Sequence, residues 1–298
     1  WFKLGRSSLG ESMNLINKLK PPMSYQGGKQ KVGKELASII SKEDACYVDL
    51  CCGSGAVSIA LINRGVPPSD ITMVDASDWG CFWEQVATGS FDSDLFEDMI
   101  YNIPINPDHI KQYLHELSKE TWDDSEEIID TIPLWLILQA GSFGGKQIWS
   151  EGGQFRNASF RNYWKPTEIS KRRSPVNPMM PMPKTLLENV QNCVSSMDSI
   201  KAVHGDVVDF DWGYYDREVR SKEKVVVYID PPYIGTMGYG FKLDYLNYIQ
   251  ELNLPSNYSL YMSDCIPRSD TSYLLGETKK GGISGGSRVR KEYLTEVH

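Results

Sequence analysis

Short apolar runs alternate with stretches of helical periodicity at both ends of the chain. The clearest run is at residues 225–229, where three valines, a tyrosine and an isoleucine predict a buried central strand. Similar runs predict further strands at residues 46–50, 71–74, 200–203 and 258–263. Helical patterns follow or precede them at residues 31–41, 56–63, 184–195 and 244–251. This alternation indicates an α/β fold around a parallel sheet.

The alternation is lost between residues 83 and 183. An acidic stretch at residues 92–130 is expected to be helical and solvated, and an apolar helix is expected at residues 132–140. We expect residues 83–183 to form an insertion or small second domain. A body of residues 21–82 and 184–298 would carry it, and residues 1–20 would be a flexible lead or a remnant of cloning.

Composition places the chain among globular proteins, with 41% hydrophobic and 23% charged residues in a length of 298. No apolar run approaches the roughly 18–20 residues of a membrane span, and no secretion signal is evident. Six cysteines without a Cys-x-x-Cys pair, and four scattered histidines, fit neither a disulfide framework nor a metal site. We therefore expect an intracellular, cytoplasmic protein that binds neither membrane nor metal.

Charge is segregated along the chain. The net charge of −8 argues against indiscriminate coating of nucleic acid. However, residues 83–130 hold thirteen acids and two bases, whereas residues 141–173 hold seven bases and two acids. In the basic stretch, aromatic residues alternate with cations and asparagines, as suits phosphate contacts and base-edge hydrogen bonds, although a solvated hairpin with packed aromatics also fits. The candidate DNA contacts there are Lys146, Arg156, Asn157, Arg161, Asn162, Lys165, Arg172 and Arg173.

The sequence Asp230-Pro231-Pro232-Tyr233 ends the predicted central strand. The two prolines supply no N–H donors and bias the residue before each of them away from helix. An acid, a rigid elbow and an aromatic ring are therefore expected at the carboxyl edge of the sheet, where open α/β folds bind their ligands.

A glycine loop follows the first predicted strand, in the sequence Asp-Leu-Cys-Cys-Gly-Ser-Gly at residues 49–55. Glycines let a ligand approach the backbone closely. The loop lacks the Gly-x-Gly-x-x-Gly of dinucleotide enzymes and the Gly-Lys-Ser/Thr of a Walker loop. An acid ahead of Gly-x-Gly better suits a cationic ligand such as S-adenosylmethionine. Asp75, at the end of the second strand, is placed to bind a ribose, and Asp206 follows another strand end and could reach an adenine amino group.

Near the start of the chain, residues 25–29 read Tyr-Gln-Gly-Gly-Lys before a predicted helix. Such a turn, with two glycines and one cation, can hold a carboxylate or phosphate. On its own it also fits a simple surface turn.

Taken in order, these motifs resemble the Dam-like, D12-class N6-adenine DNA methyltransferases. That family places a Trp-x-Gly-Gly-Lys element first, followed by a glycine loop, a target-recognition insertion and Asp-Pro-Pro-Tyr. Residues 25–29, 49–55, 83–183 and 230–233 match this order, and residues 288–294 resemble the family's arginine-bearing C-terminal strand. Tyr25 replaces the usual Trp and Cys51 the Phe of Phe-x-Gly-x-Gly, changes expected to adjust cofactor packing rather than abolish it.

The resemblance implies a Rossmann-like methyltransferase sheet with an inserted, mainly helical target-recognition domain. It also implies S-adenosylmethionine as cofactor and double-stranded DNA as partner. The implied cofactor-binding residues are Tyr25, Gly28, Lys29, Asp49, Cys51, Gly53, Ser54, Gly55, Asp75, Asp206, Val207 and Asp230. The implied catalytic residues are Asp230, Pro231, Pro232 and Tyr233, and Arg288 and Arg290 join the DNA contacts.

In the mechanism that the resemblance implies, Lys29 meets the cofactor carboxylate, while Asp230 and the Pro231 carbonyl accept hydrogen bonds from the adenine amino group. Tyr233 stacks on the flipped base. N4-cytosine methylation stays open as an alternative, because it uses the same tetrad on another exocyclic amine. An inactive methyltransferase fold that binds DNA or scaffolds a partner also stays open. The insertion lacks the residues associated with reading GATC, so the sequence does not indicate the target. It also indicates neither the oligomeric state nor whether the role is bacterial or viral.

Overall fold

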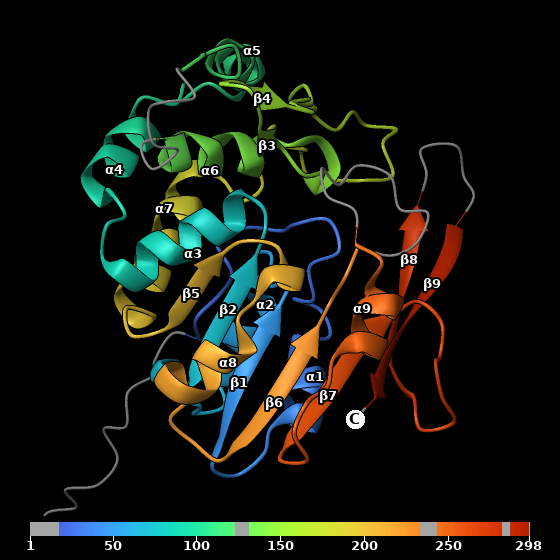
Figure 1. The fold of residues 1–298 in the computed structure, drawn as a ribbon. Coiled ribbons are helices and arrows are strands. Elements are labelled where there is room, and N and C mark those ends of the chain that lie inside the picture. The colour runs from blue at the N-terminus through green and yellow to red at the C-terminus, as the bar shows by residue number, and fades with distance from the viewer. Residues whose placement is uncertain (1–17, 123–130, 233–242, 282–286, 298) are drawn as a thin grey trace, which may run out of the picture.

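The computed structural model of the chain describes residues 18–122, 131–232, 243–281 and 287–297 (Figure 1). Within these ranges, seven strands form one sheet in the order β5-β2-β1-β6-β7-β9-β8. The five strands from β5 to β7 are parallel, and β9 is antiparallel to both β7 and β8. The strand bounds are β1 Ala45–Leu50, β2 Ile71–Asp75, β5 Lys201–His204, β6 Lys224–Ile229, β7 Tyr258–Asp264, β8 Tyr273–Gly281 and β9 Ser287–Glu296. The predicted α/β fold with a mostly parallel sheet is confirmed.

The parallel strands are those that the apolar runs predict, and the predicted C-terminal strand lies within β9. The sequence does not predict strand β8, because only its first three residues are apolar or aromatic and the rest are glycine, charged residues and threonine. The helices of the body are α1 Gly33–Ile40, α2 Ala56–Ile62, α3 Asp78–Thr88, α7 Pro183–Ser196, α8 Trp212–Tyr214 and α9 Tyr245–Glu251.

Strand β6 lies in the middle of the sheet and is covered on both faces. Val226 and Tyr228 point into a core that includes residues of α1 and α2. Val227 and Ile229 point into a second core, which includes Tyr245 of α9. Figure 1 shows α8 and α9 in front of the sheet, on the face opposite α1 and α2. Burial on both faces explains why β6 is apolar throughout rather than alternating.

The acidic stretch forms two amphipathic helices, α4 Ser93–Tyr101 and α5 Pro107–Leu117, as far as the structure describes it; residues 123–130 lie outside the described residues. The prediction of a solvated segment holds only for the acidic side of these helices. Phe96 and Ile100 of α4 and Ile110 and Leu114 of α5 are buried. Helix α6, Ile132–Gly141, packs against α3, α4 and α5, and all ten of its residues are buried, so it forms the centre of this helical group.

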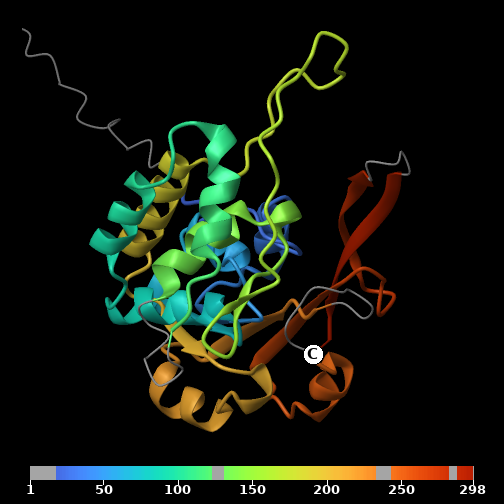
Figure 2. The same ribbon diagram turned by 90° about the horizontal axis from the view of Figure 1, so that it is seen from above.

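The second half of the predicted insertion is extended rather than helical. A short hairpin of β3 Trp149–Ser150 and β4 Phe155–Arg156 is followed by a long arm, residues 161–176. The backbone N–H and C=O groups of Trp164 and Val176 bond reciprocally across the arm, at 3.0 and 2.9 Å. Figure 2 shows the arm, in yellow-green, projecting from the body on the same side as the red β8–β9 hairpin.

The predicted start of the insertion at residue 83 falls inside α3. Trp83 is fully buried in the core that α1 and α2 share, and α3 packs on β2 and β5. The beginning of the predicted insertion therefore shares the core of the body. None of the described helices is long and apolar enough to cross a membrane.

Candidate functional site

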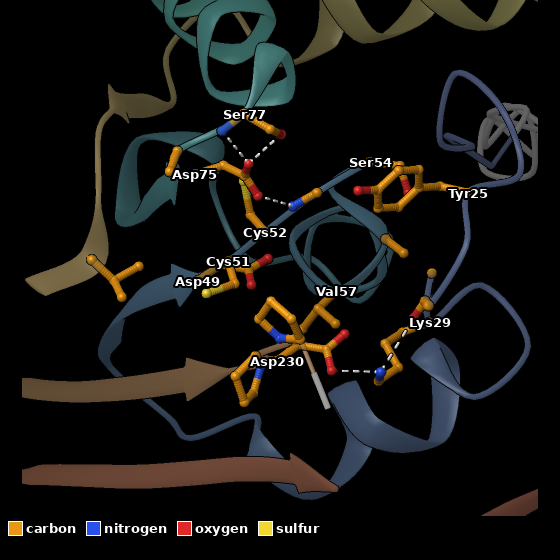
Figure 3. Close-up of a pocket in the computed structure, with 18 of the residues that line it drawn as sticks. Tyr25, Lys29, Asp49, Cys51, Cys52, Ser54, Val57, Asp75, Ser77 and Asp230 are labelled. Atoms are coloured by element: carbon orange, nitrogen blue, oxygen red, sulfur yellow. Dashed lines mark hydrogen bonds and ion pairs between the residues drawn. The ribbon is translucent and has the colours of Figure 1, made fainter. Parts of the chain in front are cut away.

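A pocket opens at the carboxyl edge of β1, β2 and β6, and encloses about 920 Å³ of space with the solvent at its mouth included (Figure 3). Most residues predicted to bind the cofactor line it together: Tyr25, Gly28, Lys29, Asp49, Cys51, Gly53, Ser54, Asp75, Asp206, Val207 and Asp230. Pro231 and Pro232 line it as well, whereas Tyr233 lies outside the described residues.

The glycine loop reaches the pocket through unusual backbone angles. Cys51, Gly53 and Gly55 have φ values of 59°, 49° and 71°, in the left-handed region. The indole N–H of Trp83 donates to the Gly53 carbonyl at 2.8 Å, which fixes the loop from below. A side chain at Gly55 would place its Cβ 2.6 Å from the Trp83 ring. Gly55, the one predicted cofactor residue that does not line the pocket, is therefore a packing position beneath the loop.

Asp75 joins the glycine loop to the start of α3. Its carboxylate accepts hydrogen bonds from the Gly53 N–H at 2.7 Å, the Ser77 N–H at 2.9 Å and the Ser77 hydroxyl at 2.5 Å. The side chain is 9% exposed and faces the pocket. These bonds hold the predicted ribose-binding acid in a single orientation.

Asp49 is a buried acid at the floor of the pocket. The Ser58 hydroxyl donates to its carboxylate at 2.6 Å and the Ser58 N–H at 3.3 Å. Burial raises the pKa of Asp49 to about 7, the hydrogen bonds from Ser58 oppose this, and the charges of Asp230 and Asp75 add to it. Four carboxyl groups thus line one pocket, those of Asp49, Asp75, Asp206 and Asp230, an environment that favours a cationic ligand.

Lys29 connects the first motif to the tetrad. Its ammonium lies 2.6 Å from an Asp230 carboxylate oxygen, 3.2 Å from a Glu292 carboxylate oxygen and 3.2 Å from the Gly27 carbonyl. The lysine side chain is 5% exposed, and the two acids are 17% and 14% exposed. The sequence predicted Lys29 at the cofactor carboxylate; in the structure it lines the pocket while paired with Asp230 (Figure 3).

The wall of the pocket includes a buried hydroxyl and two cysteine thiols. The Ser54 hydroxyl is buried and has no hydrogen-bond partner among the described residues, so it can bind a ligand oxygen. Burial raises the pKa of the Cys51 and Cys52 thiols well above the usual value, so both thiols are neutral where they line the pocket.

In the part of the chain that the structure describes, no group of three or more His, Cys, Asp or Glu side chains could hold a metal ion.

The sequence model of the D12 class N6 adenine-specific DNA methyltransferase family matches residues 25–256. This chain belongs to that family. The match runs from Tyr25 past the tetrad, so it includes the glycine loop, the insertion and all the residues that line the pocket, but not β7, β8 or β9. No curated protein matched the chain. The tetrad alone is compatible with either adenine or cytosine as substrate, and membership of this family favours adenine.

The predicted DNA contacts of the basic stretch lie near the hairpin and on the arm. Near the hairpin, Arg156 pairs with Glu151 at 3.4 Å and the Asn157 amide donates to the Gln147 carbonyl at 2.7 Å. Lys146 is exposed beside them.

The arm carries the rest of the cationic residues of the basic stretch. Arg161 is half-buried at its base, where burial and then the charge of Arg172 lower its pKa. Lys165 lies 3.8 Å from Asp108, and Asn162, Arg172 and Arg173 are exposed. Arg288 and Arg290 belong to β9, but their side chains lie outside what the structure describes.

Gln147 and Glu292 are among the residues of the site that the sequence does not predict. Gln147 of the insertion lines the pocket, and the Gln26 N–H donates to the Gly145 carbonyl at 2.8 Å, so the insertion contacts the first motif. The glycines before Lys146 were the available signal, but they were interpreted only as part of the DNA-contacting stretch. Glu292 was the other omission, and only the fold shows that it reaches Lys29.

Proposed function

We propose that this protein transfers a methyl group from S-adenosylmethionine to the N6 amino group of adenine in double-stranded DNA, at a short specific sequence. The observation that carries the proposal is the position of Asp230. Its carboxylate lies at the carboxyl edge of the sheet, beside two prolines and in the same pocket as the glycine loop, in a chain of the N6-adenine family.

The pocket residues fit S-adenosylmethionine. Asp49, Asp75 and Asp230 provide the negative environment that a sulfonium cation needs, and Asp206 with Val207 forms the wall proposed for the adenine. The buried Ser54 hydroxyl is available to the carboxylate of the methionine part. When bound, the cofactor would supply an activated methyl group to an attacking amine.

Asp230 and the Pro231 carbonyl would act on the target amine. The lone pair of an adenine N6 is delocalised into the ring, so the amine is a poor nucleophile. Two acceptors on its N–H groups would favour a tetrahedral nitrogen and stabilise the positive charge that develops as the new bond forms. Because the proline ring restricts the backbone, the carbonyl of Pro231 is held in a defined direction. A carboxylate accepts several hydrogen bonds, so Lys29 and the amine can share Asp230.

The target base must leave the duplex to reach this depth, which costs a few kcal/mol. We propose that residues 83–183 read the DNA, that residues 21–82 and 184–298 carry the chemistry, and that Tyr233 stacks on the flipped base. The arm and the β8–β9 hairpin project on the same side of the body, which supports phosphate contacts from both (Figure 2). Binding through such cations should weaken steeply with salt.

The test is methyl transfer from labelled S-adenosylmethionine to unmethylated DNA, followed by identification of the methylated nucleoside. Wild type and Asp230→Ala are compared with a control variant, Asp198→Ala. Asp198 is an exposed acid just before the amino end of β5, whereas Asp230 follows the carboxyl end of β6. We expect N6-methyladenine from the wild type and the control, and none from Asp230→Ala. N4-methylcytosine would overturn the substrate, and cofactor binding without transfer to any DNA would overturn the proposed reaction.

A further inference from the structure

We infer that Glu292 is a positioning residue for the reaction: it holds the Lys29 ammonium, which in turn orients the Asp230 carboxylate. This inference rests on the proposed function, because it assumes that Asp230 accepts the target amine. Glu292 lies on β9, outside the residues that match the family.

The Lys29 ammonium is held between two carboxylates and a backbone carbonyl. A lysine ammonium has three N–H donors, and acceptors close to this one among the described residues include Asp230 at 2.6 Å, Glu292 at 3.2 Å and the Gly27 carbonyl at 3.2 Å. The lysine side chain is 5% exposed, so the loss of an acceptor leaves a largely buried donor with a weaker partner set. Without Glu292, the flexible lysine stem is free to turn the ammonium toward the remaining acceptors, and Asp230 would turn with it.

The β8–β9 hairpin contacts the lysine-bearing turn at a second point. Gly276 is the partner of Glu292 across the two strands, at an irregularity in the ladder. A Cβ added at Gly276 would lie 3.3 Å from a methyl group of Val32, three residues after Lys29. The hairpin therefore lies against the residues that follow Lys29, and it places an acid beside the lysine at the same register position.

A connection from DNA to the reacting carboxylate follows from this placement. In sequence, the same two strands carry Lys279, Lys280, Arg288 and Arg290, cations suited to phosphate. A hairpin that holds DNA would thus also hold Lys29, and through it Asp230.

The kinetic test compares Glu292→Gln and Glu292→Leu with wild type. The amide oxygen of Gln can still accept from Lys29, whereas Leu cannot. The matched control is Glu277→Gln, which removes an acid from the same hairpin that is half-exposed and lies 3.9 Å from Lys291. We expect kcat to fall in the order wild type, Gln, Leu, with a loss of about tenfold or more for Leu, because small misplacements of reacting groups cost up to about 100-fold. The dissociation constant for S-adenosylmethionine should stay within about twofold, and the control should match wild type.

Wild-type kcat in Glu292→Leu would overturn the inference. So would equal losses of kcat in both variants accompanied by loss of cofactor binding, because that pattern indicates only a structural role.

A second experiment measures stability and does not depend on methyl transfer. Urea unfolding of Lys29→Met, Glu292→Leu and the double variant should give non-additive shifts of the midpoint if the pair interacts as observed. Additive shifts would overturn the inference even in an active enzyme, whereas non-additive shifts in a protein without methyl transfer would support the clamp and remove only the proposed function.

Discussion

Gly55 and Gly89 offer a direct test of how the glycine loop is held. Gly55 has φ 71° and ψ 21° at the start of α2, and Gly89 has nearly the same angles, φ 70° and ψ 19°, at the end of α3. Their surroundings differ. An added Cβ at Gly55 would lie 2.6 Å from a carbon of the Trp83 ring and 2.9 Å from the terminal carbon of Met73, whereas nothing lies within 4 Å of one at Gly89.

Alanine at Gly89 should cost only the backbone strain of the left-handed region, about 1–2 kcal/mol. Alanine at Gly55 should cost the same strain plus about 1–3 kcal/mol for overpacking. The added cost arises because the Trp83 ring is fully buried and its N–H is bonded to the Gly53 carbonyl, so it cannot move aside without breaking that bond. Gly55→Ala should also weaken binding of S-adenosylmethionine, because relief of the clash displaces the loop.

The assay is urea unfolding of wild type, Gly55→Ala and Gly89→Ala, with tryptophan fluorescence as the signal. Cofactor affinity is measured separately by calorimetry. Because the two glycines share their backbone angles, the difference between the variants isolates the clash with Trp83. A loss of stability at Gly55 no larger than that at Gly89, together with unchanged cofactor affinity, would refute this account of the loop.

Two buried carboxyl groups give predictions of opposite sign. Because the pKa of Asp49 in the folded protein, about 7, lies above its usual 3.8, the stability that this group contributes is fully present below about pH 4 and is lost as pH rises through 7. Asp49→Asn should therefore raise the free energy of unfolding at pH 8 on the order of 4 kcal/mol and flatten its pH dependence; identical urea midpoints for both proteins at pH 5 and pH 8 would contradict this. Burial acts to raise the pKa of Asp264, but hydrogen bonds from Arg268 and its neighbours outweigh it and hold the pKa below the usual value. Arg268→Leu should cost about 2–4 kcal/mol at pH 7, and the cost should shrink as pH falls through the lowered pKa of Asp264; an unchanged unfolding curve at pH 7 would show that the pair contributes nothing.

The pocket could be predicted largely from sequence because its members follow the ends of parallel strands. Asp49, Asp75 and Asp230 come at or just after the carboxyl ends of β1, β2 and β6, and such ends meet at one edge of a sheet whatever the rest of the chain does. Local patterns were therefore enough to bring these carboxyl groups together.

The remaining features depend on packing between distant segments. Glu292 reaches Lys29 only because β9 inserts between β7 and β8, and no local pattern reports that pairing. Gly55 resembled a ligand-binding glycine, but its neighbours Trp83 and Met73 became visible only in three dimensions. The acidic helices were predicted to be solvated because charge dominates their composition, although Phe96 and its apolar neighbours occur at helical spacing and are buried.

The most direct test of the central proposal is sequencing that detects modified bases in DNA from cells that lack adenine methylation and express this protein. Wild type should produce N6-methyladenine at a single short sequence throughout the genome, and Asp230→Ala, expressed at the same level, should produce none. Methylated cytosine at a defined sequence, or unmodified DNA in cells that hold folded wild-type protein with cofactor bound, would contradict the proposal.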